Sequence, residues 1–173
     1  MEKLRGEYDF EIEWKAYELI PEGSSRPLPT PEQLKRGFES FKCTAEKEGL
    51  EVNFNPNFKS SRLALEGAKY AQQKNCFEAY NMKVLEAQFI KSKNIADPKV
   101  LIEIALEAGL DKTEFKLVLE ERRMKDAVDA DLAEAKKLQV MAVPTYFIGK
   151  TKIVGTQSEA VLRKAFNELE NKK

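Results

Sequence analysis

The residues of this chain that could perform covalent chemistry are two cysteines, Cys43 and Cys76. They lie far apart in the sequence, and neither belongs to a C-x-x-C motif. Both fall within predicted helices and away from a helix N-terminus, so nothing evident stabilises either thiolate, although Cys76 lies nearer to a helix start. We expect two separate, partly buried thiols without a catalytic role; a disulfide between them stays open, because sequence cannot place their Cα atoms.

Composition removes several classes of function. The chain has no histidine, which excludes Ser-His and Cys-His nucleophile pairs and the commonest metal ligand. Lys plus Arg and Asp plus Glu both number 29, which gives no electrostatic reason to expect a nucleic acid or an anionic membrane as partner. No stretch approaches the roughly 20 apolar residues of a membrane span. The charged start at Met1–Asp9 lacks a signal-peptide core, which predicts a cytoplasmic location.

A second candidate for function is the tripeptide Val143-Pro144-Thr145, which precedes a short apolar run. A proline that enters a strand is unusual, because it cannot donate a hydrogen bond to a sheet. The tripeptide therefore indicates either a trans proline that begins a strand or a special turn with a cis peptide bond.

Two kinds of element must position these residues. Apolar residues at helical spacing predict a block of helices between residues 30 and 139, with Thr30, Asp97 and Asp111 as caps. We expect the inner faces of the first two helices to hold these residues: Leu34, Phe38, Phe41 and Ala45, then Leu63, Leu65, Ala68 and Tyr70.

Strand patterns flank the helical block. Phe10–Tyr17 alternates apolar and polar residues, which predicts a half-buried strand. Residues 146–148 and 152–154, with a tight turn at Gly149 and Lys150 between them, predict an antiparallel hairpin. A final helix follows Ser158. We expect the first strand and the hairpin to share one sheet.

The stretch Leu138–Gly149, followed by Ile153-Val154-Gly155 and a capped helix, resembles the C-terminal half of a thioredoxin fold. It is most similar to the DsbA-type proteins, in particular the FrnE-like branch of cytoplasmic dithiol oxidoreductases. The resemblance runs from about Asp9 to the C-terminus, and three further stretches support it: Trp14–Glu22, Gly49–Phe54 and Asn94–Leu101.

The resemblance implies an α/β, thioredoxin-like fold with a large all-helical insertion. It implies one domain over residues 1–173, in which 1–22 and 140–173 form the thioredoxin-like part and 30–139 form the insertion. The family's first strand and first helix, which carry its C-P-x-C motif, have no counterpart in this sequence. No residue here therefore matches the catalytic cysteines.

The resemblance also assigns substrate binding. Pro144 would be a cis-proline, and the backbone of Val143 would hydrogen-bond to an extended substrate chain, with Thr145 beside them. Protein thiols and disulfides would be the partners, and neither a metal nor an organic cofactor is implied.

Three functions stay open at this point. The first is a disulfide oxidoreductase whose redox motif lies outside the sequence as given. The second is a relative of 2-hydroxychromene-2-carboxylate isomerases and kappa-class glutathione transferases, for which glutathione would be the ligand. The third is a non-catalytic binding module that forms homo-oligomers through exposed sheet edges, since such edges recruit other chains.

Overall fold

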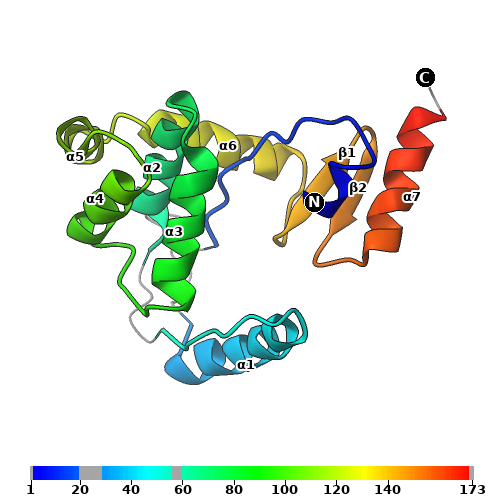
Figure 1. The fold of residues 1–173 in the computed structure, drawn as a ribbon, viewed down its shortest axis with the longest axis horizontal. Coiled ribbons are helices and arrows are strands. Elements are labelled where there is room, and N and C mark those ends of the chain that lie inside the picture. The colour runs from blue at the N-terminus through cyan, green and yellow to red at the C-terminus, as the bar shows by residue number, and fades with distance from the viewer. Residues whose placement is uncertain (1, 20–28, 56–59, 172–173) are drawn as a thin grey trace. The chain divides into compact units, whose positions relative to one another are not determined.

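The computed structural model describes residues 2–19, 29–55 and 60–171 (Figure 1). The chain divides into two compact units. Residues 1–17 and 131–173 form the first, here called the hairpin unit, and residues 18–130 form the second, the helical unit. The domain boundary that the sequence placed at residue 22 lies outside the described residues.

The helices of the helical unit begin where side chains satisfy the backbone N–H groups of a first turn. Thr30 starts α1 with a capping box: the Thr30 hydroxyl accepts from the Gln33 N–H, and the Gln33 side-chain carbonyl accepts from the Thr30 N–H. The carboxylates of Asp97 and Asp111 cap α4 and α5 by accepting from the N–H groups of Lys99 and Glu114. The helices are α1 (Pro31–Lys47), α2 (Arg62–Gln73), α3 (Phe77–Phe89), α4 (Pro98–Glu107), α5 (Lys112–Glu120) and α6 (Lys125–Lys137), of which α6 continues into the hairpin unit.

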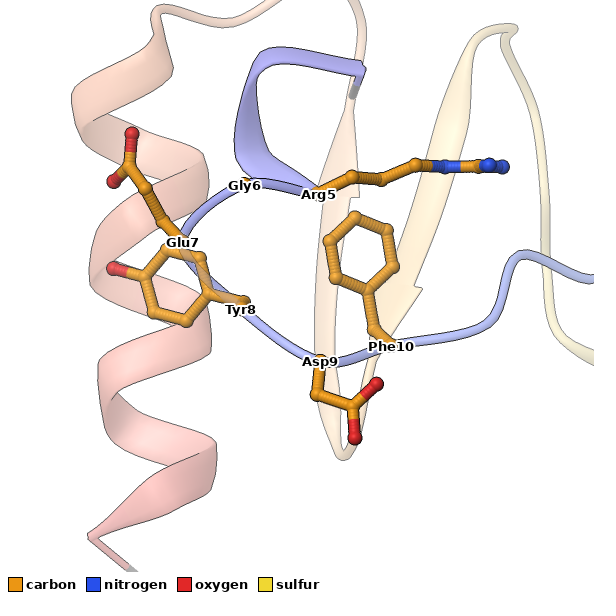
Figure 2. Close-up of a pocket in the computed structure, with 6 residues that line it drawn as sticks. All are labelled: Arg5, Gly6, Glu7, Tyr8, Asp9 and Phe10. Atoms are coloured by element: carbon orange, nitrogen blue, oxygen red, sulfur yellow. The ribbon is translucent and has the colours of Figure 1, made fainter.

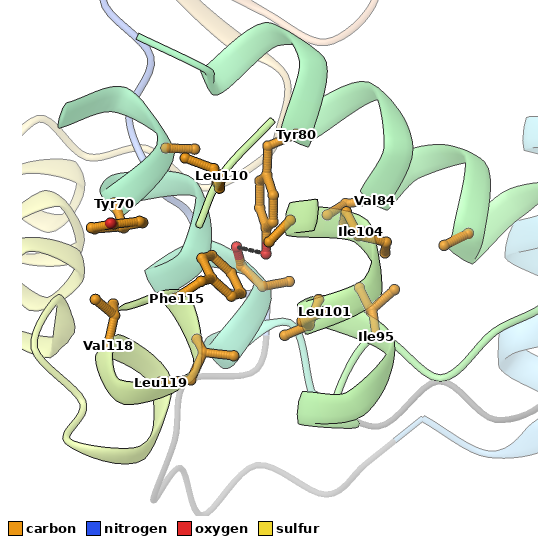
Figure 3. Packing of buried hydrophobic residues seen from close by; sticks show 14 residues of the cluster. Tyr70, Tyr80, Val84, Ile95, Leu101, Ile104, Leu110, Phe115, Val118 and Leu119 are labelled. Carbon is orange, nitrogen blue, oxygen red and sulfur yellow. Dashed lines mark hydrogen bonds between the residues drawn. The ribbon is translucent and has the colours of Figure 1, made fainter. Parts of the chain in front are cut away.

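Helices α2 to α5 pack around one apolar core (Figure 3). Tyr80 of α3 and Phe115 of α5 lie at its centre and are completely buried. The Tyr80 hydroxyl donates to the Ala64 carbonyl at 3.4 Å. Gly67 of α2 faces these two rings, and a Cβ atom there would lie 2.2 Å from the Tyr80 hydroxyl oxygen. This close approach requires a glycine.

The inner face of α2 holds most of the residues that the sequence predicted, since Tyr70 is buried and Leu63 and Ala68 pack against the core. Leu63 and Leu65 are only half-buried, whereas the charged residues Arg62 and Glu66 are buried. The prediction missed these two buried charges, because charged residues are rarely buried in proteins. Burial of this kind requires that each charge find a partner.

Those partners come from both ends of the helical unit. Arg62 donates to Glu66 at 2.8 Å, to Glu18 at 3.3 Å and to Asp129 of α6. Arg122 donates to Glu66 at 2.7 and 2.8 Å. Arg62 therefore fastens the first residue of the unit to its last helix.

Asp129 is held by two cations. Hydrogen bonds from Lys125 and Arg62 lower the pKa of its carboxyl group below the ordinary value of an aspartate.

In the hairpin unit, β1 (Thr145–Ile148) and β2 (Thr151–Val154) pair antiparallel, with Ile148 opposite Thr151. Gly149 takes a φ of +57° in the turn, a conformation that favours glycine. Helix α7 (Glu159–Glu170) lies beside the hairpin (Figure 1). The apolar side of α7 covers one face of the hairpin. The cluster there also contains Leu4, the last residue of the short 3-10 helix η1 (Glu2–Leu4). Its buried members are Leu4, Ile148, Ile153, Leu162, Ala165 and Phe166.

The predicted strand at Phe10–Tyr17 is not formed. Among the described residues the sheet has only β1 and β2, so the expectation of a shared sheet was wrong. The alternation describes burial only in part: Ala16 is buried and Glu11 and Glu13 are exposed, but Trp14 on the predicted inner face is 42% exposed. Alternation predicts which face is buried, but a strand also needs a neighbour to bond with, and the Ala16 N–H donates instead to the Asp131 carboxylate at 2.6 Å.

Candidate functional site

The loop between α6 and β1 places the predicted site residues on one exposed turn. Gln139, with a φ of +52°, ends α6, and the chain then turns through residues 140–144 into β1. The Val143–Pro144 peptide bond is cis, as the resemblance implied. The Thr145 hydroxyl donates to the Ala142 carbonyl at 2.6 Å and closes the turn.

Of the two residues joined by the cis bond, Pro144 has a backbone hydrogen bond and Val143 does not. The Pro144 carbonyl accepts from the Gly155 N–H at 2.7 Å, which extends the hairpin by one bond. In the part of the chain that the structure describes, the backbone N–H and carbonyl of Val143 have no hydrogen-bond partner. The Val143 side chain is 44% exposed. Val143 therefore offers a donor and an acceptor to another molecule.

The outer edge of β1 continues this open position. In an antiparallel pair, residues with hydrogen bonds across the pair alternate with residues whose N–H and carbonyl point away from it. Pro144 and Gly155 are bonded, so Thr145 and Phe147 point their backbone groups outward, away from β2. Val143, Thr145 and Phe147 thus line the outer edge of β1, with which no other strand pairs among the described residues.

Lys152 of β2 ties the loop to the hairpin, and sequence reasoning missed it. Its ammonium donates to the carbonyls of Leu138 and Gln139 at 3.0 and 2.6 Å, and it lies 5.8 Å from the centre of the Phe147 ring. A cation at the C-terminal end of a helix satisfies carbonyls that the helix leaves unpaired. The signal in the sequence was weak, since an outward lysine on a strand is ordinary.

The two cysteines lie in the helical unit and are both free thiols. Cys43 is exposed on α1. Cys76 is the N-cap residue of α3, so its predicted position away from a helix N-terminus was wrong. Asn75 has a φ of +57°, which interrupts the helical conformation between α2 and α3, so that α3 begins directly after Cys76. The Cys76 thiol is half-buried and donates to the Lys74 carbonyl at 3.4 Å.

A separate hollow of about 410 Å³ lies at the N-terminal turn (Figure 2). Its lining comes from one run of consecutive residues, Arg5–Phe10. Within residues 2–19, 29–55 and 60–171, no three cysteine, aspartate or glutamate side chains gather as a metal-binding group. The hollow lacks polar groups converging from several elements, which is what binding sites usually have, so the proline loop is the better candidate.

Comparison with known proteins decides the family. The model of the DSBA-like thioredoxin domain matches residues 1–167. The chain belongs to this DsbA-like family. The Bacillus subtilis protein YwbO is 36% identical to it over 99% of this chain and 88% of its own length.

Solved structures support the same family. The probable DsbA oxidoreductase SCO1869 of Streptomyces coelicolor superposes with a TM-score of 0.73 and 25% identity, over 82% of this chain. The chain spans 62% of that structure's length. A 2-hydroxychromene-2-carboxylate isomerase shares the fold, with a TM-score of 0.66 and 21% identity over 83% of this chain and 72% of its own.

The DsbA-like chain therefore has the expected fold class, a thioredoxin-like α/β fold with a large helical insertion and a small sheet. No helix in the described part of the chain is long and apolar enough to cross a membrane. Membership of this family favours thiol–disulfide chemistry, or the chemistry of a related family, as the function in which the proline loop takes part.

Proposed function

We propose that this DsbA-like chain provides the substrate-holding surface of a thiol–disulfide oxidoreductase. Its cis-proline loop binds an extended segment of a protein substrate through the backbone of Val143. The observation that supports this most is the exposed cis Val143–Pro144 bond, next to a Val143 backbone with no hydrogen-bond partner among the described residues.

The geometry suits an extended peptide better than a compact ligand. A peptide beside β1 can exchange backbone hydrogen bonds with Val143 and continue along Thr145 and Phe147, which is the β-strand addition mode of recognition. Main-chain bonds of this kind do not depend on the substrate's side chains. The loop would therefore hold many different protein segments in one orientation.

The exchange reaction sets what else the activity needs. A thiolate attacks one sulfur of a disulfide, a mixed disulfide forms, and the other sulfur leaves as a thiolate. The sequence contains no C-x-x-C pair for this step. We assign to this chain the holding of the substrate, and to neither Cys43 nor Cys76 the attack.

Two variants of Val143 separate backbone recognition from side-chain recognition. The probe is a synthetic disulfide-containing peptide, titrated while the chain's backbone amide signals are followed by NMR. Val143→Pro removes the backbone N–H, and we expect about 3- to 10-fold weaker binding, the equivalent of one hydrogen bond. Val143→Ala keeps the N–H and serves as the matched control, with binding close to that of the original chain. Circular dichroism checks that both variants are folded.

Three results would contradict the proposal. The peptide could fail to shift the signals of the loop, or both variants could bind it equally. Reduced glutathione could bind at the loop while the peptide does not, which would favour a glutathione-binding relative. Insulin reduction above background that Cys43→Ser or Cys76→Ser abolishes would instead assign the attack to a cysteine of this chain.

A further inference from the structure

Tyr17 reaches the loop that leads to Val143 from the N-terminal segment of the hairpin unit. Its hydroxyl donates to the Val140 carbonyl at 3.3 Å, and its side chain is half-buried. The backbone next to Tyr17 is itself fixed on α6, because the Ala16 N–H donates to the buried Asp131 carboxylate at 2.6 Å. Tyr17 therefore holds the loop from an anchored position.

Lys152 holds the same loop from β2. Its ammonium donates to the carbonyls of Leu138 and Gln139, so Lys152 and Tyr17 together bond to three consecutive carbonyls. The N–H groups of residues 138–140 bond back to carbonyls of α6 at 2.8–3.1 Å. Both backbone groups of each of these three residues are thus engaged, although none of them lies in a helix or a strand.

Val143 lies between fixed neighbours. The Ala142 carbonyl accepts from the Thr145 hydroxyl at 2.6 Å, and the Pro144 carbonyl accepts from the Gly155 N–H at 2.7 Å. The N–H and carbonyl of Val143 have no such bond within the described ranges. A free backbone unit between fixed points keeps few directions, whereas the same unit in an unanchored loop samples many.

We propose that Tyr17 and Lys152 are positioning residues, which keep the Val143 backbone in the conformation that a substrate chain can bond to. This inference rests on the proposed function. Both residues act through the loop and not through contact with the substrate. When only a fraction of the molecules has the binding conformation, the dissociation constant rises by the inverse of that fraction. A loop held in place before binding also loses less conformational freedom when the substrate binds.

The affinity of the folded chain separates positioning from a merely structural role. A structural role would lower the free energy of unfolding and leave peptide binding by the folded chain unchanged. The probe is the synthetic disulfide-containing peptide, titrated by NMR under conditions in which circular dichroism shows every variant to be folded.

Two changes of tyrosine to phenylalanine form a matched pair. Tyr17→Phe removes only the hydroxyl, and we expect the dissociation constant to rise about 3-fold or more, since one hydrogen bond shifts a loop equilibrium by about 3- to 10-fold. Tyr8→Phe is the control, because Tyr8 lies in the same segment but donates at 2.7 Å to Asn167 of α7. It should bind the peptide as tightly as the original chain.

Lys152 allows a rescue experiment. Lys152→Met should also weaken peptide binding about 3-fold or more, because two loop carbonyls lose their donor. Lys152→Arg should restore most of the affinity, since a guanidinium group can donate to both carbonyls. Nitrogen relaxation of the Met141 and Ala142 amides should show more motion on the ps–ns timescale in Tyr17→Phe and Lys152→Met than in the original chain.

A double variant tests whether Tyr17 acts through Val143. In a Val143→Pro background the N–H that the loop positions is absent, so Tyr17→Phe should weaken binding less than in the original chain. An equal loss in both backgrounds would overturn the inference.

Other results would overturn positioning and leave the proposed function standing. These are peptide binding that neither Tyr17→Phe nor Lys152→Met weakens, or an equal loss of affinity in Tyr8→Phe. A peptide that shifts no loop signals of the original chain would instead refute the proposed function and this inference together.

Discussion

The contact between Gly67 and Tyr80 gives the sharpest test of the helical core. Changing Gly67 to Ala adds one methyl group inside α2, where alanine is favoured over glycine by about 1 kcal/mol. The added Cβ would lie 2.2 Å from the Tyr80 hydroxyl oxygen and 2.8 Å from Cζ of both Tyr80 and Phe115. Both rings are completely buried, so neither can turn into solvent.

The balance of these terms predicts a loss of stability. Overpacking a core costs about 1–3 kcal/mol, occasionally more, and displacing the Tyr80 hydroxyl from the Ala64 carbonyl costs about 1 kcal/mol. After the gain in helix propensity, we expect Gly67→Ala to lower the free energy of unfolding by about 1–3 kcal/mol. Urea denaturation followed by far-UV circular dichroism measures this change.

Gly37 of α1 supplies the matched control. It also lies inside a helix, but a Cβ there would meet nothing within 4 Å. Gly37→Ala should therefore raise the free energy of unfolding by about 0.5–1 kcal/mol. Changes of the same sign at both glycines would refute the reasoning.

A double variant identifies the obstacle. Tyr80→Phe removes the nearest atom, the hydroxyl oxygen, and leaves the contacts at 2.8 Å. Gly67→Ala should then cost about 1 kcal/mol less in the Tyr80→Phe background than in the original chain. Strictly additive free energies would show that the hydroxyl is not what excludes the methyl group.

Three further changes and one control variant test the ion pairs and the loop. Arg62→Met should lower the free energy of unfolding by about 3 kcal/mol, because it leaves buried carboxylates without a partner. Arg163→Met, at an exposed ion pair, should lower it by less than about 1 kcal/mol. Urea denaturation measures both changes. Lys152→Met should speed amide hydrogen exchange over residues 138–144 about tenfold, measured by mass spectrometry, because two helix-end carbonyls lose their donor. The lowered pKa of Asp129 means that its contribution to stability is complete above its unfolded pKa of about 3.9 and falls as the pH drops towards its folded value. Asp129→Asn should therefore flatten the loss of stability below about pH 4, and an unchanged acid limb in urea denaturation would contradict this.

Local signals in the sequence predicted the elements that local physics determines. The caps Thr30, Asp97 and Asp111 each begin a helix, because a side-chain oxygen satisfies first-turn N–H groups whatever the rest of the chain does. The turn at Gly149 and Lys150 likewise specifies its hairpin from its own residues.

The errors came where a partner distant in sequence decides the outcome. The burial of Arg62 and Glu66 on α2 was missed, because their partners at Glu18, Arg122 and Asp129 are not recognisable from spacing. The strand at Phe10–Tyr17 failed for the same reason, since its formation depends on a neighbouring strand.

In the candidate site, too, local features were predictable from the sequence and features that depend on distant residues were not. The types of Val143, Pro144 and Thr145 were readable from the sequence, because a proline before an apolar run is a local pattern. Which residues of β1 point their backbone groups outward was not readable, because this follows from the pairing of Pro144 with Gly155.

In both units of the chain, a buried charged side chain joins backbone segments that are far apart in sequence. The chain passes between the units twice, after Tyr17 and after Ala130, so each unit must keep two distant segments together. The hairpin unit does so through Asp131, whose carboxylate accepts from the Ala16 N–H. The helical unit does so through Arg62, which binds residues near both of its ends.

Buried charges suit this task because they are costly when separated. Removing one partner of such a contact leaves a buried charge uncompensated, which costs several kcal/mol. Each unit can thus hold its ends closed by itself. The loop at Val143 then rests on a hairpin unit whose two chain segments are joined at Ala16 and Asp131, whatever happens in the inserted helices.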